Sequence, residues 1–252
     1  MKIFANLPGF VRLITCLKYL SVNKKIIEDA RAAGDYENER EHILKSTRIW
    51  GPHLMDAFGS NLSISGLENL PDSGPVVIVS NHQGYADIAA CSVAFQKFQF
   101  GFVAKAELSK IPLYGPWIGR IRSVFIERDD ARASLKAINE GIKYIEDGFS
   151  LVIFPEGTRS RGPEPGLFLK GALKLATKPG VPIVPVSING TYRMFEDDGR
   201  IKGADIGMII HPPIPTEGIS RQEEKALMDT VENIIIGGVR KLQAEEAKAE
   251  EE

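Results

Sequence analysis

A histidine and an aspartate stand five residues apart in the stretch VVIVSNHQGYAD, residues 76–87, and this pair is the clearest candidate for chemistry in the chain. An apolar, β-branched run typical of a buried strand ends at Asn81 and His82, and Asp87 precedes a run of helical character. Because ligands of open α/β sheets bind beyond the carboxyl ends of the strands, we expect His82 at such an edge. A carboxylate that holds one imidazole nitrogen leaves the other to act as a general base.

Titratable side chains also follow three other strand-like runs. Lys105 follows residues 100–104, Glu127 and Arg128 follow residues 124–126, and the turn 155–160 follows residues 151–154. If these strands are parallel neighbours, their polar ends converge on one crevice. Each group alone could also be a solvated side chain. Arg128, which is followed by two aspartates, could form a surface ion pair, and such pairs contribute little to the free energy of folding. Four strand ends that each deliver a titratable group favour a shared site.

The second informative stretch is FPEGTRS, residues 154–160. Pro155 lacks an N–H and ends the strand, and Gly157 allows the backbone to approach a ligand closely. The next three residues, 158–160, offer hydroxyl, backbone and guanidinium donors, a set that suits a phosphate. The alternative is a plain polar turn.

Composition excludes several classes of function. The chain has 252 residues, 43% of them hydrophobic and 25% charged, which fits one large domain or a domain with an appended lobe. Its net charge of -2 predicts no nucleic-acid partner, so that any anion site must be local. Two cysteines in apolar settings argue against a disulfide framework, and four histidines without ligand spacing indicate no metal site. Residues 3–22 are too polar for a transmembrane helix and lack a signal-peptide pattern.

The order of segments predicts an α/β protein in three parts: a helical N-terminal lobe at 1–58, an α/β body at 59–243 and a charged, disordered tail at 244–252. Alternating strand and helix patterns favour a mostly parallel sheet flanked by helices. The strand-like runs are 76–79, 100–104, 124–126, 151–154, 183–188 and 206–210, and the helix-like runs are 88–98, 131–146, 167–177 and 221–243.

The N-terminal lobe has two interpretations. Residues 3–20 have the pattern of an amphipathic helix, and residues 26–58 predict helix broken near Gly34 and kinked near Pro52. The first helix either packs on its own domain or lies in a membrane interface with basic residues facing anionic lipid. The residues alone leave both interpretations open.

Common catalytic motifs are missing. The sequence has no GxSxG elbow, no GxxxxGK[ST] phosphate loop and no GxGxxG after a strand. No serine or cysteine nucleophile stands beside His82, so we expect this base to act directly on a substrate hydroxyl.

Four blocks together resemble a known family. NHQGYAD at 81–87 resembles the NHx4D motif of the glycerolipid acyltransferases, in particular the 1-acylglycerol-3-phosphate (lysophosphatidic acid) acyltransferases. SVFIERDD at 123–130, FPEGTRS at 154–160 and VPIVPVSI at 181–188 resemble the next three blocks, in the family's order. A histidine and an aspartate at this spacing are unspecific alone, but FPEGTRS in order behind them makes the resemblance specific.

The resemblance implies a mechanism and an acyl donor. His82 would deprotonate the free sn-2 hydroxyl of 1-acylglycerol-3-phosphate, and Asp87 would hold the imidazole. The hydroxyl would attack a thioester of acyl-CoA or acyl carrier protein and give phosphatidic acid, without an acyl-enzyme, a cofactor or a metal. The implied substrate-binding residues are Arg159, Thr158, Lys105 and Arg128 for the phosphate, and Glu156 and Gly157 for the glycerol.

One departure concerns the acceptor. Many family members have a serine where this chain has Gly84. Another lysophospholipid or an amino-acid lipid therefore stays an alternative acceptor, and a lipid-binding protein on the same scaffold or a thioesterase stays an alternative function. The family implies a peripheral or monotopic protein on the cytoplasmic side of a membrane, and in some members the N-terminal helices dock on the membrane, which favours the interfacial interpretation of residues 3–20. The residues leave open the oligomeric state and the choice between the two donors.

Overall fold

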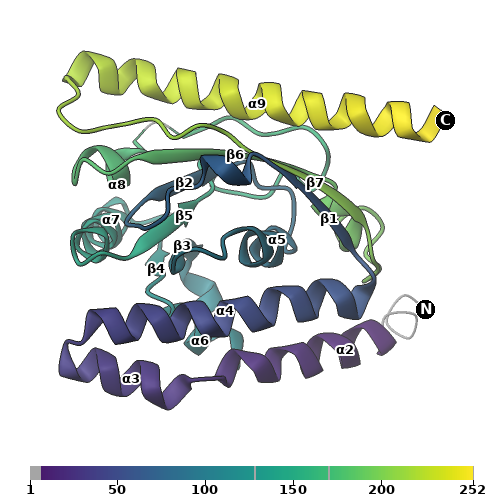
Figure 1. Ribbon diagram of the computed structural model, residues 1–252, viewed down its shortest axis with the longest axis horizontal. Helices are drawn as coiled ribbons and strands as arrows, with labels where there is room; N and C mark the ends of the chain where they lie inside the picture. Colours follow the sequence, from purple (N-terminus) through teal and green to yellow (C-terminus); the bar gives the residue numbers. More distant parts are fainter. Residues whose placement is uncertain (1–6, 128, 170, 252) are drawn as a thin grey trace.

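The computed structural model describes residues 7–127, 129–169 and 171–251, and its centre is a sheet of seven strands in the order β1-β7-β6-β2-β5-β3-β4 (Figure 1). Every neighbouring pair is parallel except β6 with β7. The prediction of a mostly parallel sheet is confirmed. The strands are β1 (Asn61–Ser65), β2 (Val77–Ser80), β3 (Phe100–Lys105), β4 (Val124–Ile126), β5 (Ser150–Ile153), β6 (Ile183–Asn189) and β7 (Asp205–Ile210).

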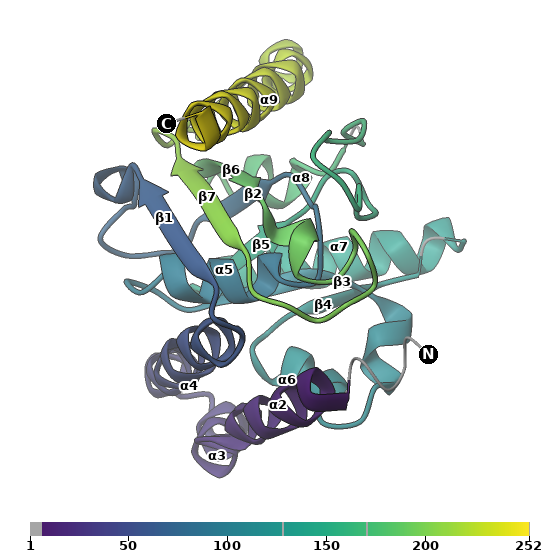
Figure 2. The same cartoon turned by 90° about the vertical axis from the view of Figure 1, so that its right-hand side faces the viewer.

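Helices cover both faces of the sheet, as Figure 2 shows from the side. One face carries α7 (Ala131–Glu146), α8 (Lys174–Thr177) and α9 (Arg221–Glu251) over one buried apolar cluster. The other carries α5 (Asp87–Ala94), with α2 (Leu7–Leu17), α3 (Lys24–Ala33), α4 (Tyr36–Phe58) and α6 (Tyr114–Arg120) outside it. Both faces of β2, β5 and β6 are buried, which explains their nearly unbroken Val and Ile runs.

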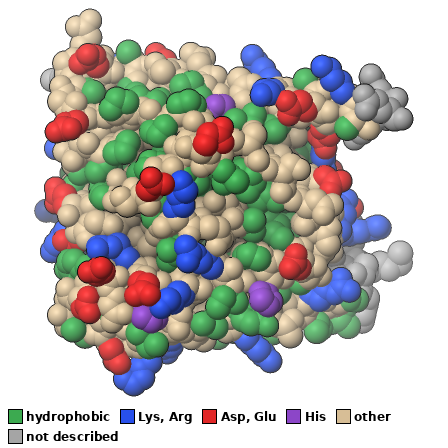
Figure 3. Space-filling view, viewed as in Figure 1, with side chains coloured by type: hydrophobic (Ala, Val, Ile, Leu, Met, Phe, Trp, Pro, Cys, Tyr) green, Lys and Arg blue, Asp and Glu red, His purple; other side chains and the backbone are tan. Residues whose placement is uncertain are grey.

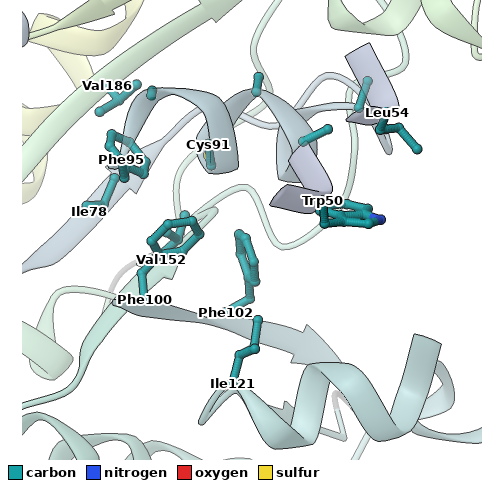
Figure 4. Close-up of a cluster of buried hydrophobic side chains, with 14 of the residues drawn as sticks. Trp50, Leu54, Ile78, Cys91, Phe95, Phe100, Phe102, Ile121, Val152 and Val186 are labelled. Carbon is teal, nitrogen blue, oxygen red and sulfur yellow. The ribbon is translucent and has the colours of Figure 1, made fainter. Parts of the chain in front are cut away.

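The second apolar cluster lies between α4, α5 and the sheet (Figure 4). Phe100 makes edge-to-face contacts with Phe95 and Phe102, at 5.5 Å between ring centroids in both cases. Trp50 of α4 packs against Trp117 of α6, with centroids 4.9 Å apart. These rings join the N-terminal helices to the α/β body in one core, so the described part of the lobe, 7–58, is packed against the body.

A buried ion network reinforces this junction. The carboxylate of Glu39, in α4, is fully buried and accepts two bonds of 2.7 Å from the Arg122 guanidinium of the body. Arg31 of α3 donates a further bond of 2.8 Å to the same carboxylate. The predicted break near Gly34 is confirmed, since α3 ends there with φ 71° and α4 begins at Tyr36.

Three parts of the structure differ from the sequence prediction. Strand β1 was not predicted, because it lies in the segment 59–74, whose Gly, Ser, Asn and Pro residues are typical of turns. NLSIS does alternate polar and apolar residues as a half-buried strand does, but over only five positions. The predicted helix at 167–177 is limited to α8, because Gly171 adopts φ 94° and Leu169 N–H bonds to the Pro155 carbonyl at 2.8 Å.

The predicted disordered tail at 244–252 is wrong for the residues described, because α9 continues to Glu251. Its final Glu, Ala and Lys residues are strong helix formers. Glu246 also pairs with Arg193 and accepts a bond of 3.1 Å from Asn189 at the end of β6. The helix is therefore anchored to the sheet near its C-terminal end.

Candidate active site

The two sequence motifs meet at one edge of the sheet. β2 and β5 are parallel neighbours, with Val79 opposite Ile153, so the loops that follow them leave the sheet side by side. The main chains of these loops are bonded: Ser160 N–H donates to the His82 carbonyl at 2.8 Å, and Arg161 N–H donates to the next carbonyl at 3.1 Å. The expected convergence of the His82 and Arg159 loops is therefore present.

Asp87 holds the imidazole of His82. Its Oδ2 accepts bonds from Nδ1 of His82 at 2.6 Å and from the main-chain N–H groups of Gln83 and Gly84 at 2.8 and 3.1 Å. Its Oδ1 accepts the hydroxyl proton of Thr191. Asp87 is fully buried and is the first residue of α5, where the helix dipole favours a negative charge. Four donors fix the carboxylate in place.

The imidazole is held on its flat side as well. The ring of Phe154 stacks on it, with centroids 4.1 Å apart and planes 15° from parallel. Within the described chain, Nε2 of His82 has no hydrogen-bond partner, and 18% of the side chain is exposed. One nitrogen is thus bonded to a carboxylate while the other can accept a proton from an entering hydroxyl, as a general base requires.

Glu156 supports the histidine loop from the β5 side. Its two oxygens accept bonds from His82 N–H at 2.6 Å and from Gly166 N–H at 2.7 Å. The residue is 7% exposed, and burial raises the pKa of its carboxyl group. Both oxygens bind the main chain, so Glu156 holds His82 in position, and its contact with the acceptor's glycerol stays a prediction.

Arg159 is held by two contacts. Its Nη1 bonds to Oε1 of Glu196 at 2.6 Å, and its guanidinium carbon lies 3.6 Å from the centre of the Tyr85 ring. The main-chain N–H of Tyr85 donates to the same Oε1 at 3.0 Å. The Arg159 side chain is 19% exposed and that of Glu196 only 3%. The guanidinium is therefore fixed in orientation, with most of its donors not used by Glu196.

Two glycines leave room for these contacts. Gly157 adopts φ 68°, and a Cβ there would lie 2.8 Å from a Leu169 methyl group. A Cβ on Gly84 would lie 2.5 Å from Oε2 of Glu196. The departure from the family pattern at Gly84 thus has a local reason, since the space that a serine side chain would need is occupied by a carboxylate.

No described contact joins the remaining predicted binding residues to His82 or Asp87. Thr158 is exposed, and Lys105 ends β3, the strand next to β5, where it pairs with Glu107 at 3.3 Å. Arg128 lies outside the described residues. In the parts of the chain that the structure describes, no group of His, Cys, Asp and Glu side chains could hold a metal ion.

Sequence reasoning missed the residues that reach this site from β6 and the segment after it. The amide of Asn81 exchanges two bonds, of 2.8 and 2.9 Å, with the main chain of Ile188. The fully buried Gln83 accepts from Gly190 N–H at 2.9 Å. Thr191 and Glu196 follow in the same segment. The amide side chains of Asn81 and Gln83, on either side of His82, were the available signal in the sequence. They do not identify the residues that contact this loop, because those residues are more than 100 positions away.

Comparisons with known proteins agree with this geometry. The family model described as "Acyltransferase" matches residues 61–189. A chloroplastic 1-acyl-sn-glycerol-3-phosphate acyltransferase, BAT2 of Brassica napus, is 37% identical over 182 residues, covering 71% of this chain and 52% of that protein. The 1-acyl-sn-glycerol-3-phosphate acyltransferase of Borreliella burgdorferi is 30% identical, with 71% of each chain covered. The chain spans about half the length of the plant relatives.

A solved structure is similar over nearly the whole chain. The crystal structure of the 1-acyl-sn-glycerophosphate (LPA) acyltransferase PlsC from Thermotoga maritima superposes with a TM-score of 0.73 at 28% identity. The match covers 94% of this chain and 98% of that one, so it extends well beyond residues 61–189.

Proposed function

The chain belongs to the acyltransferase family, and we propose that it transfers a fatty acyl group from a thioester to the free hydroxyl of 1-acylglycerol-3-phosphate, giving phosphatidic acid. The proposal depends on one observation: a general base and an arginine that can bind an anion lie in the loops that follow two adjacent strands. The pair of His82 and Asp87 follows β2, and Arg159 follows β5.

The proposed reaction is one direct transfer. Nε2 of His82 takes the proton of the acceptor hydroxyl while that oxygen attacks the thioester carbonyl. The tetrahedral intermediate collapses, the C–S bond breaks, and the thiolate takes the proton from the imidazolium. Asp87 stabilises the imidazolium throughout, and general-base catalysis of this kind contributes about 10²–10⁴ in rate. The rest must come from positioning both substrates and stabilising the oxyanion.

The acceptor's phosphate is assigned to Arg159. A guanidinium offers donors in a planar fork that matches two phosphate oxygens. Thr158 on the same turn, and Lys105 and Arg128 on the next strand exits, stay predicted auxiliary ligands.

We further propose that the protein works at a membrane surface, on the cytoplasmic side, with acyl-CoA or acyl carrier protein as donor. Large apolar side chains of α2 are exposed at helical spacing: Leu7, Phe10, Val11 and Ile14, each between 42% and 58%. In Figure 3, hydrophobic side chains lie among basic and acidic ones along the lower part of the molecule, where α2 and α3 lie in Figure 1. That composition suits an interfacial helix. No helix in the described residues is long and apolar enough to cross a bilayer.

A time course of thiol release from acyl-CoA, with and without lysophosphatidic acid, tests the activity. We expect release only with acceptor, and its loss in His82→Ala. The control is His42→Ala, since His42 lies on α4 and its ring bonds within that helix, to the Asn38 carbonyl at 3.0 Å. Thiol release at the same rate with and without acceptor would indicate a thioesterase. Undiminished turnover in His82→Ala would exclude His82 as the general base. If only phosphodiester lysolipids are acylated, the assignment of 1-acylglycerol-3-phosphate as the acceptor is refuted.

A further inference from the structure

The carboxylate of Glu196 joins the two halves of the site. Its Oε1 accepts one bond from the Arg159 guanidinium at 2.6 Å and one from the main-chain N–H of Tyr85 at 3.0 Å. Tyr85 belongs to the loop between His82 and Asp87, whereas Arg159 belongs to the turn after β5. We propose that Glu196 is a positioning residue that fixes the spacing between the catalytic base and the anion-binding arginine, and so sets the affinity for the acceptor's phosphate. This inference rests on the proposed function.

Burial distinguishes this contact from a surface ion pair. The Glu196 side chain is 3% exposed, and its Oε2 is buried without a hydrogen-bond partner in the described chain. That oxygen lies where a side chain on Gly84 would otherwise be. A buried carboxylate with an unsatisfied oxygen is costly. Such a cost is expected where a residue is held in place for function.

The alternative is that Glu196 competes with phosphate for Arg159 and weakens binding. The geometry favours positioning, because the arginine has five N–H donors and Glu196 takes only one of them. The contact with the Tyr85 ring fixes the plane of the guanidinium, and the carboxylate fixes its rotation within that plane. An arginine held in this way loses less conformational entropy when phosphate binds.

The spacing also has a chemical purpose. In 1-acylglycerol-3-phosphate, the reacting hydroxyl and the phosphate lie on neighbouring carbons of one glycerol. When Arg159 holds the phosphate, the distance from Arg159 to His82 decides whether the hydroxyl reaches Nε2. Effective proximity depends on such placement to within about 1 Å. Glu196 lies beyond residues 61–189, so the family match does not include it.

Two substitutions separate positioning from charge. Glu196→Gln can keep both bonds, since one amide oxygen accepts at the Oε1 position, whereas Glu196→Ala removes both. We expect Glu196→Ala to raise the acceptor KM about 10- to 100-fold and also to lower kcat, because the acceptor hydroxyl is then less well placed at Nε2 of His82. We expect Glu196→Gln to stay within about 3-fold of wild type and the donor KM to be unchanged in both. The control is Asp197→Ala, which removes a half-exposed carboxylate 3.6 Å from Lys202.

Two measurements keep the inference separate from the proposed function. The first is the equilibrium binding of short-chain lysophosphatidic acid to the full chain without any thioester, and the second is turnover with acyl-CoA. Binding that weakens in Glu196→Ala and is restored in Glu196→Gln supports the inference, even if wild type shows no turnover and the proposed function fails. Turnover in wild type with unchanged binding in Glu196→Ala overturns the inference alone. Tighter binding in both variants also overturns it, because it would show competition.

Discussion

The hydroxyl of Thr191 is predicted to contribute to catalysis without touching a substrate. Thr191 is fully buried and donates its proton to Oδ1 of Asp87, whose Oδ2 holds the imidazole of His82. Thr191→Val keeps the shape of the side chain and removes this donor. The Asp87 carboxylate then keeps its bonds at Oδ2 but loses the only described partner at Oδ1.

The size of the effect follows from the type of bond. A hydrogen bond to a charged group contributes about 1.5–3 kcal/mol. If this loss falls on the step that forms the imidazolium, kcat decreases roughly 10- to 150-fold. The acceptor KM should change little, because Thr191 lies behind Asp87, away from the exposed side of His82.

The assay is steady-state turnover at saturating acceptor and donor, well below the melting temperature of each variant. The matched control is Thr191→Ser, which keeps the hydroxyl and should retain kcat within about 3-fold. A fall in both variants would indicate lost packing. An unchanged kcat in a folded Thr191→Val would refute the argument and leave the orientation of Asp87 to its main-chain donors.

Three further predictions concern stability and pH. Glu39→Ala leaves the Arg122 guanidinium buried without its carboxylate and should lower the free energy of unfolding by about 3–5 kcal/mol in denaturant titrations, whereas Lys25→Ala, in an exposed pair, should give no measurable change. Gly157→Ala places a side chain at φ 68° against a leucine methyl group and should cost about 1–2 kcal/mol and lower kcat, as melting curves and turnover would show. Burial, with a smaller effect of a nearby lysine, lowers the pKa of His211 below 6.5. The stability that the neutral imidazole contributes should be present above pH 6.5 and be lost as the pH falls through the lowered pKa. Denaturant titrations of His211→Gln at several pH values should not show this dependence.

Sequence was sufficient for those parts of the site that are local. His82 and Asp87 are five residues apart, and each lies at an element boundary that hydrophobic patterning marks. The strand exits of β2 and β5 were predicted to meet, and they do, because parallel strands place their carboxyl ends on one edge. That prediction assumed that the two strands are neighbours, since nothing in either segment specifies its neighbour in the sheet.

The supporting residues could not be predicted because they depend on long-range packing. Thr191 and Glu196 follow β6, and the residues that they contact between His82 and Asp87 lie 104 and 111 residues away in sequence. The segment after β6 lies over the histidine loop before the chain returns antiparallel as β7. A single sequence records neither that return nor the space at Gly84 into which Glu196 fits.

The arrangement of supporting groups suits the proposed direct transfer, which has no covalent intermediate. In such a mechanism the enzyme must hold both substrates at once. Catalysis therefore depends on a rigidly held base and a rigidly held arginine that binds the phosphate. The histidine loop is bonded from three directions: from β5 by Glu156, from β6 through Asn81, and from the following segment by Thr191 and Glu196. Three of these contacts end on main-chain N–H groups, which cannot swing away as side chains do. The loop therefore keeps its geometry before any substrate arrives, and binding energy can be used to bring the hydroxyl and the thioester together.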